Sequence, residues 1–160
     1  MPTAVTSLVP TVLTALVTAC QASSNLTGVT VVDGPRVADE SDQDRLFIGF
    51  DPEDDTAVTG DQQFAGMPGR SRDQTFEITC LAEAWTGDTD VPARRARAYQ
   101  IMAAVEQLLR PTVGDHTLGV PGLLWAQLAG GENLAQRQTS RGAYAGVTFT
   151  VTCRARLSVT

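Results

Sequence analysis

The sequence predicts an α+β fold: a largely antiparallel sheet with two helices packed on one face, in the order α-β-β-β-α-β-β(-β). Three observations predict it. Residues 8–22 and 91–110 carry apolar side chains at helical spacing, whereas residues 75–85 and 145–157 alternate apolar and polar side chains as half-solvated strands do. A chain of 160 residues has the usual size of one domain. We therefore expect a single domain over residues 1–160.

The first predicted helix covers residues 8–22. Its polar positions follow a 4-3-4 spacing along one side, and the apolar residues, with Cys20 as the last of them, cover the opposite side. The polar positions are Ser7, Thr11, Thr14 and Thr18. We expect Ser7 to cap the helix and Pro10 to lie in its first turn, where a missing N–H costs little.

The same segment has an alternative interpretation as a secretory signal, because small residues precede Cys20 as they do at a bacterial lipidation site. A signal peptide begins with positive charge, yet the first arginine of this chain is Arg36 and there is no lysine. The threonines also interrupt the apolar run. The pattern favours a helix that packs on the core.

Three strands are expected between the helices. A β-branched run at residues 27–32 precedes the turn-forming Asp33-Gly34-Pro35, and LFIGF at residues 46–50 forms the second strand. The third, at 75–85, directs Cys80 inward and Glu83 outward. Residues 51–73 are rich in Asp, Gly and Pro without any periodicity, so we expect a long acidic loop there.

Asp90 is expected to cap the second helix, which ends before Pro111. A strand at residues 123–128 then turns at Gly130–Asn133 into a partner strand over residues 134–140. The last strand carries Cys153 among its inward residues.

The charge balance limits the partners. Twelve arginines and 18 acidic residues give a net charge of −6, which disfavours nonspecific binding to the outside of a nucleic acid. An acidic surface is still compatible with DNA that slides past it. No apolar run approaches the ~20 residues that cross a bilayer, so no membrane contact is expected.

The sequence contains few residues in patterns that could catalyse a reaction or bind a metal or cofactor. Its three cysteines are widely spaced, and no Cys/His cluster suggests zinc. His116, the single histidine, is either a solvated loop residue or a general base beside Asp115. The acidic run from Asp51 to Asp55 lacks calcium-loop spacing, and no glycine pattern matches a phosphate-binding loop. We predict no catalytic residue, no cofactor and no metal site.

Two charged features are candidates for a subunit or partner interface. Arginines in the first turns of the second helix oppose its dipole, by roughly 0.3–1 kcal/mol per exposed charge. They are Arg94, Arg95 and Arg97, and the complementary acidic residues are Asp51, Glu53, Asp54, Asp55 and Asp61. Separate basic and acidic patches are what a head-to-tail interface between like subunits requires.

The chain resembles the tail terminator proteins of long-tailed, non-contractile (siphovirus-like) bacteriophages, particularly those that infect actinobacteria. The resemblance lies in the order of the elements over residues 5–157 and in four phrases: VTVVDGP, RLFIGFDP, FEITCLAEAWTGDTDVPARRARAYQIMAAVEQLL and GAYAGVTFTVTCRARL. It carries no catalytic motif.

This resemblance implies a hexameric ring at the head-proximal end of the tail tube. The ring would end tube polymerisation, join the tail to the head-completion proteins and let DNA pass through its lumen without specific binding. The chain would then be a virion component of the tail or neck, assembled in the host cytoplasm.

Three alternatives stay open. A head-completion or stopper protein would share the ring geometry at the same neck. A tail tube protein needs long hairpins for stacking, and the sequence offers only one possible hairpin of that kind. A small-ligand-binding α+β module would need a pocket with converging polar groups.

Overall fold

The computed structural model describes residues 6–35, 43–66, 71–111 and 115–158. Within them the chain forms two α-helices, a short 3₁₀ helix and seven strands, which confirms the predicted α+β class. In order these are α1 (Val9–Ala22), η1 (Ser24–Leu26), β1 (Thr30–Asp33), β2 (Asp44–Ile48), β3 (Val58–Phe64), β4 (Ser71–Thr86), α2 (Val91–Leu109), β5 (Leu123–Leu128), β6 (Asn133–Thr139) and β7 (Gly142–Ser158).

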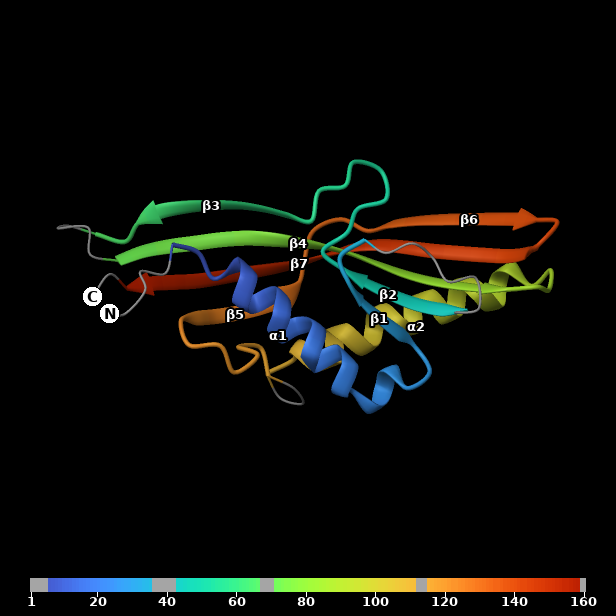
Figure 1. Ribbon diagram of the computed structural model, residues 1–160, viewed down its shortest axis with the longest axis horizontal. Coiled ribbons are helices and arrows are strands. Elements are labelled where there is room, and N and C mark those ends of the chain that lie inside the picture. Colours follow the sequence, from blue (N-terminus) through green and yellow to red (C-terminus); the bar gives the residue numbers. More distant parts are fainter. Residues whose placement is uncertain (1–5, 36–42, 67–70, 112–114, 159–160) are drawn as a thin grey trace.

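Two long strands form the centre of the sheet (Figure 1). β4 and β7 pair antiparallel along their whole length, from Ser71 opposite Ser158 to Thr86 opposite Ala143. The outer side of β4 carries β3 opposite residues 72–78 and β2 opposite residues 80–84. The outer side of β7 carries β6 and β5 one after the other. β1 is parallel to β2, and the other pairings are antiparallel.

Both helices cover one face of this sheet, which we call the helix face (Figure 1). Aliphatic and aromatic side chains from the helices and from alternate positions of β4 and β7 fill the space between the layers. The most fully buried include Val12, Leu16, Ile78, Ile101, Val105, Phe149 and Val151. This packing follows directly from the 3.6-residue and two-residue periods of the sequence.

All three cysteines lie in this core as free thiols, as their inward positions predicted. Burial raises the pKa of Cys20 and of Cys153 to about 12. The pKa of Cys80 is also raised, first by burial. Because the thiolate is the reactive form, these side chains behave as small apolar residues.

The helix boundaries differ slightly from the prediction. α1 begins at Val9, and its N-cap is Leu8 rather than the predicted Ser7. Ser7 still binds the start of the helix, because its Oγ accepts the N–H of Val9 at 3.1 Å. Pro10 lies in the first turn as expected. Asp90 caps α2 by accepting the N–H of Ala93 at 3.1 Å, and the helix ends at Leu109, before Pro111.

The first two strands are shifted from their predicted positions. β1 starts three residues later than predicted, because a turn at Thr27 and Gly28, with a Gly28 φ of 82°, follows η1 and occupies the start of that run. β2 covers Asp44–Ile48 instead of residues 46–50, since Gly49 has a φ of 75° and leaves the strand conformation. Part of the acidic segment before it, residues 36–42, lies outside the described residues.

The predicted long loop at 51–73 is wrong. Only residues 51–57 are irregular before β3, and β4 already begins at Ser71, while residues 67–70 lie outside the described residues. β3 reads VTGDQQF and most of it is exposed on both faces. A strand without a buried face has no alternation to reveal it, so its conformation comes from pairing with β4.

The expected hairpin between residues 123–128 and 134–140 is also wrong. Both predicted strands exist, as β5 and β6, but in the described part of the chain each pairs with β7 and neither pairs with the other. The hairpins formed are β3–β4 and β6–β7, the second closed by Ser140 and Arg141.

Candidate functional site

The shortened acidic loop, residues 51–57, projects from the sheet on the side away from the helices (Figure 1). Its own hydrogen bonds hold it. An Asp51 oxygen accepts the N–H of Glu53, and an Asp54 oxygen accepts the N–H of Thr56, both at 2.9 Å. The bonds to Thr56 lower the pKa of Asp54. Hydrogen bonds within the loop therefore give its carboxylates a defined arrangement in a single copy of the chain.

Asp61 does not belong to this loop. It lies on β3 opposite Thr75 and is exposed. The structure thus separates the predicted acidic patch into two parts: Asp51, Glu53, Asp54 and Asp55 on the loop, and Asp61 on the sheet edge.

The three predicted arginines lie in the first two turns of α2, where two of them bind within the chain. Arg97 Nε donates to Asp44 Oδ2 at 2.9 Å and so connects α2 to β2. Arg95 donates to Gln136 Oε1 at 2.8 Å and connects α2 to β6. Arg94 is half-buried, and its Nε has no hydrogen-bond partner in the described structure.

These arginines lie in the helix layer, whereas the acidic loop projects beyond the opposite face of the sheet (Figure 1). One copy of the chain therefore does not bring the two predicted patches together. Any pairing between them requires a second copy.

The face of the sheet away from the helices, which we call the open face, holds a charged network that the sequence analysis missed. Arg45 Nε lies 2.6 Å from Glu83 Oε1, and the Tyr144 hydroxyl donates to Glu83 Oε2 at 2.8 Å. Arg137 stacks over the Tyr144 ring at 4.7 Å. Only 8% of Arg45 and 7% of Glu83 is exposed. Burial, and then the charge of Glu83, raises the pKa of Tyr144.

The predicted outward orientation of Glu83 is correct, but its predicted solvent exposure is wrong. Arg45 is its direct cross-strand neighbour. The sequence alone does not give the register between β2 and β4, and this register is what places Arg45 opposite Glu83.

The other end of the open face carries an exposed ion cluster. Arg156 holds Asp73 through two hydrogen bonds of 2.8 and 3.1 Å, and Arg154 lies 3.4 Å from the same carboxylate. These bonds lower the pKa of Asp73. Between the two charged groups the face carries half-buried threonines of β7, at positions 148, 150 and 152.

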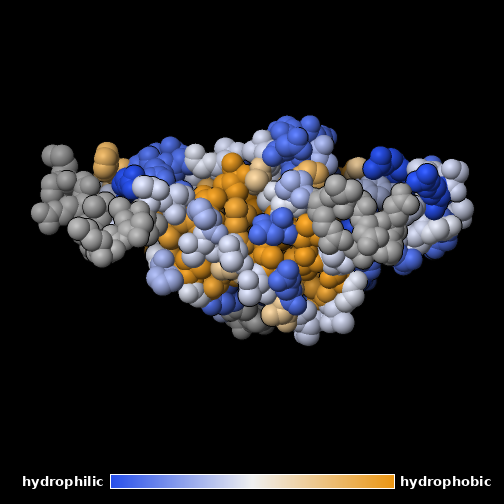
Figure 2. All heavy atoms as spheres, in the orientation of Figure 1, coloured by the Kyte–Doolittle hydropathy of each residue, from blue (hydrophilic) through white to orange (hydrophobic). Residues whose placement is uncertain are grey.

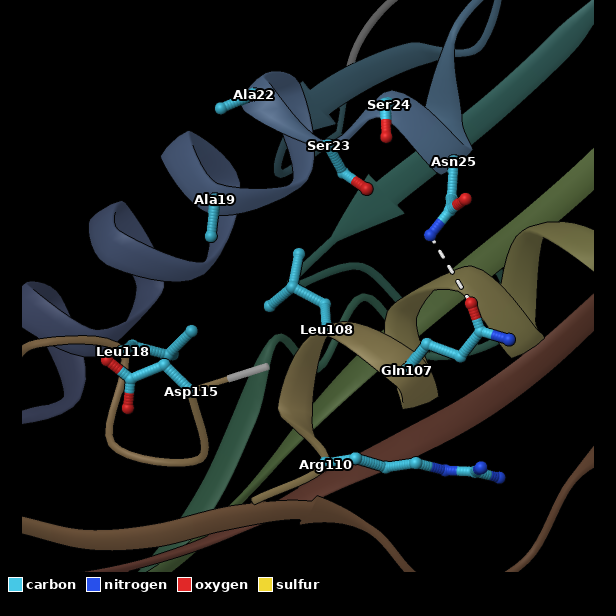
Figure 3. Close-up of a pocket in the computed structure, with 10 residues that line it drawn as sticks. All are labelled: Ala19, Ala22, Ser23, Ser24, Asn25, Gln107, Leu108, Arg110, Asp115 and Leu118. Carbon is cyan, nitrogen blue, oxygen red and sulfur yellow. Dashed lines mark hydrogen bonds between the residues drawn. The ribbon is translucent and has the colours of Figure 1, made fainter. Parts of the chain in front are cut away.

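A groove of about 710 Å³ lies between the C-terminal parts of α1 and α2 (Figure 3). Its apolar lining comes from Ala19, Ala22, Leu108 and Leu118. Its polar lining includes Asn25, which donates to Gln107 at 3.3 Å, and Asp115, which accepts both the N–H and the hydroxyl of Thr117. Those bonds to Thr117 lower the pKa of Asp115.

Among the described residues that line the groove, none forms a recognisable catalytic group. His116 is half-buried next to Asp115, and its carbonyl accepts the N–H of Ala126 at 2.7 Å. Within the described ranges no group of three or more His, Cys, Asp or Glu side chains could hold a metal ion. The groove has the size of a ligand pocket, and its walls offer both apolar and polar contacts.

The largest exposed apolar side chain in the described part of the chain is Phe64, at the end of β3, with 73% of its surface accessible. In Figure 2 an isolated apolar group stands at the end of the molecule where β3 ends in Figure 1. Leu124 and Leu134 are exposed to a smaller extent, at 41% and 37%.

Neither described helix combines the length and the hydropathy that a membrane crossing requires.

Comparison with solved structures identifies chains with a similar fold. A chain of a structure described as the virion of a native gene transfer agent particle superposes with a TM-score of 0.61 at 13% sequence identity. The match covers 95% of this chain and 99% of the other. At this identity the likeness shows a common fold over nearly the whole length of both chains. No model of a known protein family matches the chain, and no curated protein matches it.

Proposed function

We propose that the chain is a structural virion protein that forms a ring, six copies in the tail-terminator arrangement. The ring would end tail-tube polymerisation and join the tube to the head-completion proteins, with DNA passing through its lumen. The observation that carries this proposal is the full-length fold match to a chain of a virion particle. The order of the elements resembles that of tail terminator proteins, and this supports the more specific role at the end of the tail tube.

The free sheet edges support assembly into a ring. Hydrogen bonds at the two ends of the β3–β4 pairing involve Ala57 and Ala65. Because bonded pairs alternate along an antiparallel ladder, the N–H and C=O groups of the even-numbered β3 residues point away from β4. In the described structure β6 likewise pairs only with β7. Exposed edges at opposite ends of a molecule favour head-to-tail contact between copies.

The charged residues supply a second contact in this proposal. Arg94, Arg95 and Arg97 of one copy would face the acidic residues of the next, namely Asp51, Glu53, Asp54, Asp55 and Asp61. Arg94 is the strongest candidate, because Arg95 and Arg97 already bind Gln136 and Asp44. An acidic ring repels DNA phosphates, so DNA would slide through it without binding.

Particle morphology tests the proposed role. Deleting the gene from the strain that produces the particle should give tails of uncontrolled length that are not joined to heads, as electron microscopy would show. Tails of normal length on filled, joined heads would contradict the proposal.

A tail tube protein is the second candidate, because the structure has two long hairpins, β3–β4 and β6–β7, where the sequence indicated only one. The same deletion separates the two roles. Loss of a tube protein removes tails altogether, whereas loss of a terminator leaves tails that are too long.

A further inference from the structure

The end of β3 carries an apolar side chain that is largely exposed in the described structure. Phe64 is 73% exposed and lies opposite Arg72 of β4, next to the exposed Ala65. Side chains alternate along a strand, so Phe64 points to the same face as Gln62. Gln62 donates to the Thr6 carbonyl at 2.9 Å, just before α1, which places Phe64 on the helix face. An aromatic side chain offers roughly 150–250 Å² for burial.

The groove between α1 and α2 is lined by both apolar and polar side chains, and no side chain of the described residues fills it. Ala19 and Leu108 face each other across it, and Leu118 closes one side (Figure 3). Its volume of about 710 Å³ is large enough to admit an aromatic side chain together with its neighbours on a strand end.

The end of β3 and the groove cannot meet within one molecule. β3 ends at one extremity of the long sheet, whereas the groove lies beneath the middle of the molecule, where α1 and α2 end (Figure 1). A contact between them therefore joins two copies, and it uses different surfaces on each copy. That is a heterologous contact, the kind that closes into rings.

The charges around the two surfaces are complementary. Arg72, directly opposite Phe64, would bring a cation to the groove. The groove carries Asp115, whose pKa is lowered by its bonds to Thr117. It also carries Arg110, which already binds Glu106 at 2.9 Å. Pairing of Arg72 with Asp115 would fix the orientation in which Phe64 enters.

We propose that Phe64 at the end of β3 of one copy docks into the α1–α2 groove of the next copy, with Arg72 paired to Asp115. The occupant of the groove is thus a second copy of this chain. This inference rests on the proposed ring assembly and names one of its contacts.

Site-specific cross-linking tests the contact directly. Two full-length variants that both keep Phe64, Ala65→Cys and Ala22→Cys, are mixed and treated with a short thiol-specific bifunctional maleimide. The native thiols are buried with raised pKa values, so the introduced cysteines are the reactive ones. Covalent dimers should form in the mixture and not with either variant alone, because the contact brings the end of β3, where Ala65 follows Phe64, close to position 22.

Leu124→Cys mixed with Ala22→Cys is the matched control, since Leu124 is also exposed but lies on β5. Equal cross-linking in this control would mean random collision and would overturn the docking proposal. Failure of the Ala65→Cys mixture to cross-link under conditions where the wild-type chain assembles would also overturn it. In that case another occupant, such as a segment of a different virion protein, fills the groove.

Sedimentation over a concentration series gives the second measurement. Phe64→Ser should raise the dissociation constant for self-association about tenfold or more, and Leu124→Ser should leave it unchanged. Thermal unfolding of both variants should match the wild type, because neither side chain is buried. Unchanged association of Phe64→Ser contradicts the docking contact alone, whereas normal tails after gene deletion contradict the proposed function alone.

Discussion

The two faces of the central sheet achieve burial by different means. On the helix face, β4 and β7 contribute aliphatic and aromatic side chains that α1 and α2 cover. On the open face, burial comes from the Arg45–Glu83–Tyr144 network and from a small cluster of Val32, Phe47 and Leu81. The first face needs only the correct apolar pattern, whereas the second also needs every charge to meet its partner.

The largest expected effect tests the helix face. Phe149→Ala removes a side chain that is 1% exposed, and should lower the free energy of unfolding by about 3–5 kcal/mol, because the vacated space cannot refill. Chemical denaturation measures this change. A loss below about 1 kcal/mol would show that the core beneath the helices is loosely packed.

The next effect tests the open face. Glu83→Ala leaves the Arg45 charge buried without its partner, and we expect a loss of about 3 kcal/mol in the same measurement. The control is the double variant Arg45→Met with Glu83→Leu, which removes both charges and should recover most of the loss. If the double variant is as unstable as the single one, burial of the charge is not the cause.

A smaller effect is expected at the end of α1. Cys20→Ala removes one buried sulfur from the core and should cost about 1 kcal/mol of unfolding free energy. Differential scanning calorimetry can resolve the change. No loss at all would mean that α1 packs less tightly on the sheet than the burial of Cys20 indicates.

The smallest effect concerns the exposed ion cluster of the open face. The pKa of Asp73 is lowered from 3.8, first by its bond to Arg156, so its contribution is present above that value and is lost as the pH falls toward the lowered pKa. Asp73→Asn should therefore flatten the acid side of the pH–stability profile and leave neutral stability nearly unchanged. An unaltered acid profile would contradict the ion pairing.

Segments with their own periodicity were predictable from the sequence. The stripes of α1 and α2 and the alternation of β4 and β7 follow from the spacing of their apolar residues. β3 could not be found this way, because its conformation depends on pairing with β4 rather than on burial of its own side chains.

The candidate site was only partly predictable for a related reason. The sequence places arginines at the start of α2, but their partners Asp44 and Gln136 belong to distant strands that tertiary structure alone brings near. The groove combines residues from the end of α1, from η1 and from the end of α2, and no single stretch of sequence marks it.

The full-length pairing of β4 with β7 has a consequence for how the chain folds. Because Ser71 pairs with Ser158, the central ladder joins segments that are far apart along the chain and closes only after β7 has been synthesised. Such nonlocal pairing slows folding. Until it is complete, the edge of β4 that faces β7 is unpaired, so newly made chains are most prone to aggregate before their last strand is added.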